Sequence, residues 1–174
     1  FHMDGARFAN AIAKIGCSAA EMTWKAGVDA LSFGATKNGA LGAESAIFFN
    51  DSEDGSFIYR RMRSGHLVSK MRFISAQIIA YIENDLWLKN AKHANAMAEK
   101  LYQGVKDTGG IKFIYPVQSN VMFAEIEDGL RDQLWQAGFR FYTSNISGVK
   151  RSRLVTAFNT LPDDIEKFIE LAKY

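Results

Sequence analysis

One lysine stands among residues with little or no bulk in the stretch SFGATKNGALG. Lys37 is preceded by Gly34 and followed by Gly39 and Gly42. A lysine amine forms a Schiff base with an aldehyde, which makes it a common covalent catalyst. Small neighbours would let a flat cofactor lie against the backbone. Lys37 is therefore a candidate catalytic residue, and an ordinary loop lysine is the alternative.

A carboxylate and a guanidinium lie near the start, in the segment FHMDGAR. Asp4 follows a short stretch typical of a strand end, and ligands of open α/β sheets bind beyond the carboxyl ends of strands. Gly5 and Ala6 would allow a bulky group to approach. Asp4 is thus a candidate binding residue, and Arg7 follows it three residues later. A local ion pair between them at a helix start is the alternative.

The elements that must position these groups alternate between strands and helices. Apolar patterns predict strands at 1–4, 29–35 and 43–49 and helices at 6–16 and 17–27. Such alternation favours an α/β fold with a mixed, mostly parallel sheet. Gly16 is placed to end the first of these helices, and Ser18 and Glu21 have the spacing of a capping box.

The rest of the chain divides into a helical part and a small α+β part. Residues 69–87 are apolar around the whole helix circumference, which predicts burial or a place between two packed bodies. From residue 111 the pattern changes to short strands at 111–116, 119–126, 139–143 and 153–158 with helices at 128–138 and 161–174. We expect two domains, 1–83 and 84–174.

Composition narrows the possible partners. The 174 residues carry 21 Lys and Arg against 19 Asp and Glu, so no excess positive charge favours nucleic acid. No apolar run has the length of a membrane span. The single cysteine, Cys17, allows no internal disulfide, and we expect a cytoplasmic protein. Because Phe1 begins what looks like a strand end, we expect the C-terminal part of a longer protein.

Three segments taken in order carry a family resemblance: FHMDGARFANA, DALSFGATKNGALGAESAIFF and RRMRSGHLVSKMRFISAQ. They resemble the low-specificity L-threonine aldolases, pyridoxal-phosphate enzymes of the aspartate aminotransferase-like fold type I. The likeness extends over the whole chain, to RLVTAFNT and a terminal helix. It implies that residues 1–83 are the C-terminal part of the large cofactor-binding domain with a linking helix. Residues 84–174 would be the small α+β domain.

The resemblance also implies roles for single residues. Lys37 would be catalytic and bind pyridoxal 5'-phosphate covalently, and Asp4 would pair with the pyridine nitrogen. Arg7 would lie near the cofactor ring or the substrate carboxylate. Arg153, in RSRLVTAF, would grip that carboxylate, although the sequence alone favours a surface arginine. No metal is implied.

In the enzymes that this chain resembles, the basic region that corresponds to the residues after 59 helps to bind the cofactor phosphate, sometimes across a subunit interface. Arg63 and Lys70 match this role, with Arg61 and Arg72 as competing matches. His66 is a further residue that could reach the cofactor.

The implied reaction is retro-aldol cleavage of L-threonine or L-allo-threonine to glycine and an aldehyde. A homo-oligomer, dimer or tetramer, would complete the sites. The family's catalytic base, ring-stacking histidine and Gly-rich phosphate turn belong to an N-terminal half without counterpart here, so we expect the isolated chain to be inactive. Alternatives are another fold-type I pyridoxal-phosphate enzyme, either a β-eliminating lyase or an aminotransferase, and a non-catalytic scaffold fragment.

Overall fold

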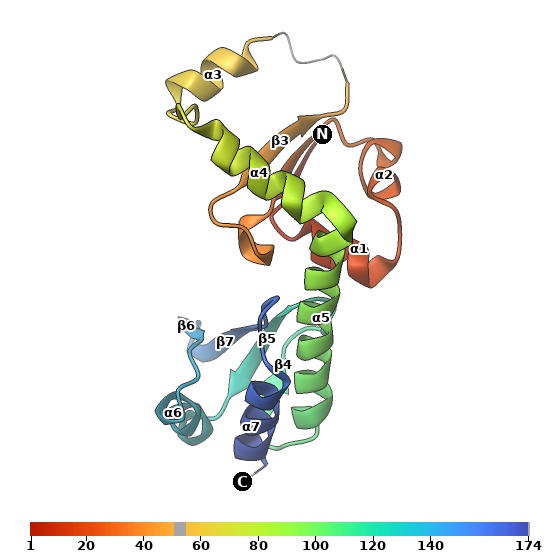
Figure 1. The fold of residues 1–174 in the computed structure, drawn as a ribbon. Helices are drawn as coiled ribbons and strands as arrows, with labels where there is room; N and C mark the ends of the chain where they lie inside the picture. The colour runs from red at the N-terminus through yellow and green to blue at the C-terminus, as the bar shows by residue number, and fades with distance from the viewer. Residues whose placement is uncertain (51–54, 174) are drawn as a thin grey trace. The chain divides into compact units, whose positions relative to one another are not determined.

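The structure, a computed structural model, describes residues 1–50 and 55–173 (Figure 1). The chain forms two compact units, Phe1–Lys89 and Asn90–Tyr174, and each has its own hydrophobic core. The sequence placed a division between residues 83 and 84. That division of the whole protein into domains stays a prediction.

The first unit is built on a three-stranded sheet in the order β1-β2-β3. Strand β1 (His2–Gly5) pairs in parallel with β2 (Ala30–Gly34), and β2 pairs antiparallel with β3 (Glu44–Phe48). The three predicted strands are confirmed, and the sheet is mixed. One of its two strand pairs is parallel.

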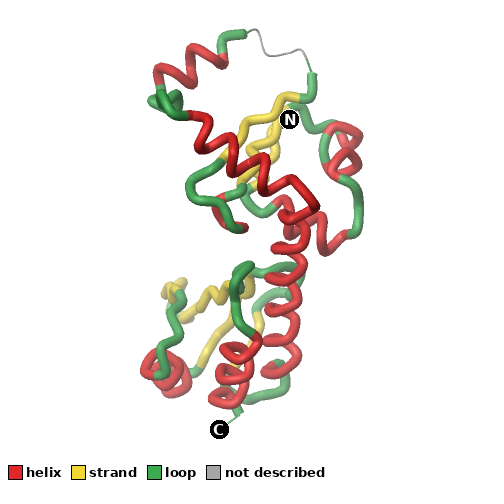
Figure 2. Tube along the Cα trace, in the orientation of Figure 1, coloured by secondary structure: helices red, strands yellow, loops and turns green. Residues whose placement is uncertain are grey.

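Helices and short 3-10 turns surround this sheet (Figure 2). They are α1 (Phe8–Ile15), α2 (Ala19–Met22), η1 (Trp24–Ala26), η2 (Thr36–Asn38), α3 (Phe57–Arg63), α4 (Met71–Ile82), η3 (Glu83–Asp85) and the start of α5 (Leu86–Val105). Gly16 ends α1 with φ 78°, a left-handed conformation that suits glycine. The predicted capping box of Ser18 and Glu21 forms at α2.

Aromatic side chains fill the core of the first unit. Phe8 stacks on Trp87 at 6.3 Å between ring centroids, and Phe33 meets the same indole edge-on at 6.0 Å. Ala35 and Ala43, which flank the Lys37 turn, are fully buried in this core. The turn therefore rests directly on packed side chains.

Helix α4 departs from the expectation of burial. Phe73, Ile79 and Ile82 are 61%, 57% and 50% exposed, and Tyr81 is its buried residue. One side of the helix packs on the core and the other side stays open. Because the open side is also apolar, large apolar side chains remain exposed on it. Burial within the chain is wrong for this helix. Its other expected setting, between packed bodies, stays a prediction.

The second unit is the α+β body expected from the sequence. Its antiparallel strands are β4 (Ile111–Phe113), β5 (Val121–Ile126), β6 (Tyr142–Ile146) and β7 (Val149–Val155), in the order β4-β5-β7-β6. Helices α5, α6 (Asp128–Gln136) and α7 (Pro162–Ala172) contribute to a core that covers one sheet face. The opposite face carries exposed side chains such as Phe123 and Tyr142.

Candidate functional site

Asp4 and Lys37 lie at the same edge of the first sheet. Strands β1 and β2 run parallel with Asp4 opposite Ser32, so their carboxyl ends share an edge. Lys37 lies in η2, directly after β2 ends at Gly34. Open α/β sheets bind their ligands at this edge. Two groups that are 33 positions apart in sequence are thus brought to one place by strand topology.

The carboxylate of Asp4 is exposed and oriented by its own turn. Its Oδ1 accepts a hydrogen bond from the backbone N–H of Ala6 at 2.9 Å. Among residues 1–50 and 55–173 it forms no ion pair. The local pair with Arg7, the alternative weighed from the sequence, is therefore not formed. The negative charge of Asp4 faces outward from the sheet edge.

The backbone around Lys37 is tightly hydrogen-bonded. The N–H groups of Asn38 and Ala40 both donate to the carbonyl of Ala35, at 3.0 and 3.2 Å, and Ala35 N–H donates to Ala43 O. Lys37 is exposed while the adjacent Asn38 is buried. The turn thus directs one long side chain away from the core and anchors the next one in it.

Close packing within the first unit explains why several residues near Asp4 and Lys37 are glycines. A Cβ at Gly5 would lie 2.6 Å from Leu31 Cδ1, and one at Gly34 would lie 3.0 Å from Ala6 Cα. A Cβ at Gly5 would also lie 2.6 Å from the backbone oxygen of Ser32, closer than Cβ atoms come, whereas at Gly34 the neighbouring chain would have to shift slightly. Close packing of the neighbouring chain therefore favours glycine at both positions. A Cβ at Gly42 would meet nothing within 4 Å.

Arg7 occupies the N-cap position of α1 and is half-buried. It lies two residues after the end of β1 at Gly5, so it belongs to the same sheet edge as Asp4.

Arg153 belongs to the second unit, on the open face of its sheet. Its guanidinium carbon lies 5.2 Å from the ring centroid of Tyr142, its cross-strand partner in β6. Phe123 is its partner in β5. A guanidinium held beside aromatic rings can bind both oxygens of a carboxylate. The surface position expected from the sequence alone and a binding role are both compatible with this geometry.

Sequence reasoning missed a second arginine on this face. Arg151 lies two positions before Arg153, so both side chains project from the same side of β7. Both arginines line a shallow pocket with a volume of about 600 Å³, which Phe123 and Tyr142 also line. The Nε of Arg151 is buried without a hydrogen-bond partner among the described residues. The alternation in RSR, read as a strand, is the signal that would have found it.

The basic candidates for phosphate binding surround the connection between α3 and α4. Arg63 ends α3, Lys70 is the N-cap residue of α4, and both are exposed, as is His66. Arg61 Nε donates to His66 O at 3.3 Å, and Arg72 lies over the ring of Phe73. Their roles at a cofactor stay predictions.

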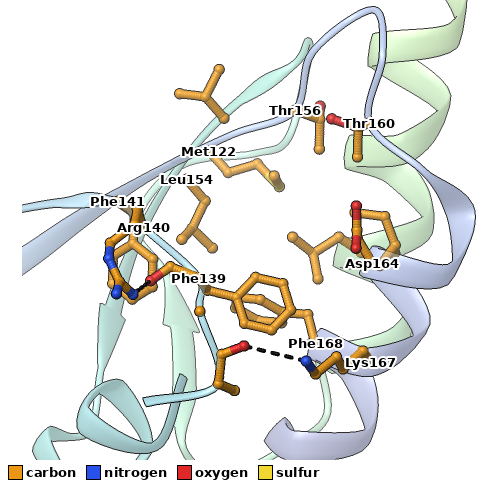
Figure 3. A pocket seen from close by; sticks show the side chains of 15 residues that line it. Met122, Phe139, Arg140, Phe141, Leu154, Thr156, Thr160, Asp164, Lys167 and Phe168 are labelled. Carbon is orange, nitrogen blue, oxygen red and sulfur yellow. Dashed lines mark hydrogen bonds between the residues drawn. The ribbon is translucent and has the colours of Figure 1, made fainter. Parts of the chain in front are cut away.

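A separate pocket of about 360 Å³ lies within the second unit (Figure 3). Met122, Leu154 and Phe168 form apolar walls, and the carboxylate of Asp164 faces the hollow. None of the candidate site residues lines it. It is therefore not part of the candidate site.

Residues 1–128 match the beta-eliminating lyase family, which covers most of the chain. The chain belongs to the beta-eliminating lyase family. Beta-eliminating lyases and threonine aldolases depend on pyridoxal phosphate, so this membership confirms the cofactor expected from the sequence.

Two curated proteins that are similar to this chain are low-specificity L-threonine aldolases. The one from Pseudomonas aeruginosa is 43% identical over 172 residues, which are 99% of this chain and 48% of the relative. The one from a Pseudomonas species is 45% identical over 150 residues, 86% of this chain and 43% of the relative. The chain spans about half the length of these relatives. The resemblance seen in the sequence is confirmed.

Solved structures confirm the fold class. The threonine aldolase of Leishmania major superposes with a TM-score of 0.89 at 26% identity, over 99% of this chain and 50% of that one. The serine palmitoyltransferase of Sphingomonas wittichii shares the fold, with a TM-score of 0.62 at 15% identity over 86% of this chain and 40% of that one.

The residues at the sheet edge fit the chemistry of pyridoxal phosphate. Lys37 offers an amine for its aldehyde, and Asp4 offers a carboxylate for its ring nitrogen. Both groups are exposed at one edge. In the part of the chain that the structure describes, no three acidic, His or Cys side chains cluster as a metal site would require. No helix of that part has the length and apolar character to cross a membrane.

Proposed function

We propose that this chain is part of a pyridoxal-phosphate lyase that cleaves L-threonine and L-allo-threonine to glycine and an aldehyde. The observation that carries the proposal is the placement of Asp4 and Lys37 at one edge of the parallel strand pair. The names of the two Pseudomonas relatives support the choice of reaction.

Lys37 would hold the cofactor covalently through its amine. Asp4 would pair with the ring nitrogen, and its negative charge would favour the protonated form of that nitrogen. When bound, the cofactor would supply an electron-poor ring, which stabilises negative charge on the carbon next to the amino group of the substrate. The hydrogen bond from Ala6 N–H keeps the Asp4 carboxylate in one orientation.

Arginines bind the carboxylate of the substrate. Arg153 does so with its planar guanidinium, which the ring of Tyr142 holds against the sheet face. Arg7 contacts either the cofactor ring or the same carboxylate. Arg63 and Lys70 contribute to binding of the cofactor phosphate.

The working enzyme is a cytoplasmic homo-oligomer that includes the half of the relatives' length absent from this chain. Large apolar side chains exposed on α3 and α4 support the oligomer. We call them the α3–α4 apolar surface: Ile58, Tyr59, Met62, Phe73, Ile79 and Ile82.

A β-elimination is the second candidate reaction, and the description of the matched family favours it. It would use the same lysine and carboxylate but would release a different product. An aminotransferase or a non-catalytic scaffold fragment has less support, since both curated relatives carry a lyase name.

Borohydride reduction of the full-length protein with pyridoxal phosphate tests the cofactor site. We expect a pyridoxyl group on Lys37 by peptide mass spectrometry and none after Lys37→Ala, while Lys25→Ala, at another exposed lysine, keeps the label. An unlabelled Lys37 would favour the scaffold.

Product analysis then separates the reactions. Glycine with an aldehyde supports the aldolase, whereas a keto acid supports β-elimination or transamination. The isolated 174-residue chain is expected to bind the cofactor poorly and to release no glycine.

A further inference from the structure

Asn38 is a buried polar residue directly after the proposed catalytic lysine. It is 4% exposed, and its Nδ2 donates to the hydroxyl of Tyr81 at 2.6 Å and to the carbonyl of Trp87 at 2.8 Å. These acceptors lie 43 and 49 residues further along the chain, at the end of α4 and the start of α5. One side chain therefore ties the Lys37 turn to two other elements.

Tyr81 is a rigid acceptor for this bond. It is 3% exposed, and its ring lies 5.9 Å from that of Phe33. Burial raises the pKa of the Tyr81 hydroxyl above its ordinary value, which keeps it neutral. Since the ring cannot move without disturbing the core, the hydroxyl marks a fixed point for the Asn38 amide.

A second bond joins the same loop to the same helix. The backbone N–H of Leu41 donates to Gln77 Oε1 at 2.7 Å. Gln77 lies one turn before Tyr81 on α4. The loop is thus held to α4 on the C-terminal side of Lys37 at two points, residues 38 and 41.

We propose that Asn38 and Tyr81 are positioning residues that fix the backbone from which Lys37 reaches the cofactor. The inference rests on the proposed function of Lys37. A lysine side chain has four flexible methylenes, so precise placement of its amine needs a fixed Cα. Asparagine suits position 38 because its amide donates two hydrogen bonds, whereas a carboxylate donates none.

Hydrogen exchange in the full-length protein tests the physical half of the proposal. The amides of Asn38, Ala40 and Leu41 report the hydrogen bonds of the loop. Tyr81→Phe keeps the ring but removes the acceptor, and Asn38→Ala removes the donor. We expect exchange at these amides to accelerate roughly tenfold or more in both variants, since local opening becomes cheaper.

Asn120→Ala is the matched control. Asn120 is also 4% exposed and donates Nδ2 to a backbone carbonyl, that of Thr156, at 2.7 Å within the second unit. It should lower overall stability without speeding exchange at the three loop amides relative to the rest of the first unit.

Steady-state kinetics tests the functional half. In Tyr81→Phe we expect kcat to fall about tenfold with KM for threonine nearly unchanged, because a displaced amine slows chemistry more than binding. The rate of borohydride labelling of Lys37 should fall in parallel. If Asn38→Ala does not fold, Tyr81→Phe decides the matter.

Loop exchange and kcat within twofold of the unsubstituted protein in Tyr81→Phe would overturn the proposal. Faster exchange with unchanged kcat would also overturn it, because the bonds would then be merely structural. An unlabelled Lys37 in the unsubstituted protein would instead refute the proposed function. The exchange rates would still report whether the hydrogen bonds of Asn38 to Tyr81 and Trp87 hold the loop.

Discussion

Asp4 illustrates how one hydrogen bond prepares a charged residue. Its Oδ1 is already occupied by Ala6 N–H, so the orientation of the carboxylate is set before any ligand binds. Asp4→Asn keeps that acceptor and removes only the charge. In the full-length protein we expect kcat to fall about a hundredfold or more, because the ring nitrogen loses the charge that keeps it protonated.

The measurement is steady-state release of aldehyde from threonine. Asp132→Asn, at an exposed carboxylate on α6, should leave kcat unchanged. Full activity of Asp4→Asn would contradict the role given to Asp4.

Arg153 offers a test of geometry as opposed to charge. Arg153→Lys keeps the positive charge but loses the planar fork that binds two carboxylate oxygens. We expect KM for threonine to rise by one to two orders of magnitude, which corresponds to about 1.5–3 kcal/mol for a hydrogen bond to a charged group. Cofactor binding, followed by absorbance, should not change. Equal KM values would assign Arg153 to the surface.

Tyr81 predicts how the first unit responds to alkali. Its pKa is raised by burial, so in the folded state the hydroxyl stays neutral when the unfolded chain already ionises. The stabilising effect is complete below about pH 10, the ordinary pKa of tyrosine, and is lost as pH rises through the higher folded value. Tyr81→Phe should therefore unfold with a weaker pH dependence above pH 10.

Denaturant unfolding at a series of pH values measures this effect. Tyr59→Phe is the control, since Tyr59 is 72% exposed and lies outside the buried core. Identical slopes for the two variants would contradict the prediction.

At the scale of elements, two helical glycines differ in what surrounds them. A Cβ at Gly104, on α5, would lie 2.3 Å from Ile169 Cδ1 on α7, whereas one at Gly129, on α6, would meet nothing within 4 Å. At Gly104 the cost of overpacking therefore opposes the gain in helix propensity that alanine would bring. We expect Gly104→Ala to cost about 1–2 kcal/mol and Gly129→Ala to gain up to about 1 kcal/mol.

Thermal unfolding of the two variants provides the comparison. If both were stabilised, Ile169 would have moved aside and the approach of α5 to α7 would not be restrictive.

Local signals in the sequence were sufficient for several elements. Gly16 after a periodic apolar stretch predicted the end of α1, and Ser18 with Glu21 predicted the start of α2. Pro162 in the first turn of α7 is a local start signal of the same kind. Each of these signals depends on neighbours within a few residues, which a sequence displays directly.

Non-local pairing was harder to predict. Strand β6 was expected at 139–143 but spans Tyr142–Ile146, and β7 begins at Val149, four residues before the predicted strand. The hairpin turns at Ser147 and Gly148, both with positive φ. Polar residues in both strands hid this hairpin: Arg151 and Arg153 lie on the open sheet face, and the buried Ser152 bonds to the Thr143 hydroxyl across the strand pair. The same pairing placed Arg151 beside Arg153.

For the whole molecule, the α3–α4 apolar surface carries the proposed contact between subunits. In the full-length protein we expect Ile79→Glu, on this surface, to lower the oligomeric state measured by light scattering, because a charge cannot be buried there unpaired. Ile15→Glu is the matched control, since Ile15 is 66% exposed on α1. An unchanged mass for Ile79→Glu would exclude this surface as the contact between subunits.

Asn84 and Asp85 have φ values of 53° and 57°, left-handed conformations seldom adopted by residues other than glycine. They interrupt α4 and α5, and the chain that follows returns Trp87 to the aromatic core, where its carbonyl accepts the Asn38 amide. A redesign guided by helix propensity would place alanines here and fuse the two helices into one straight rod. Such a chain would gain helicity but lose the packing of the Trp87 indole on Phe8 and Phe33 and the carbonyl that anchors the lysine turn.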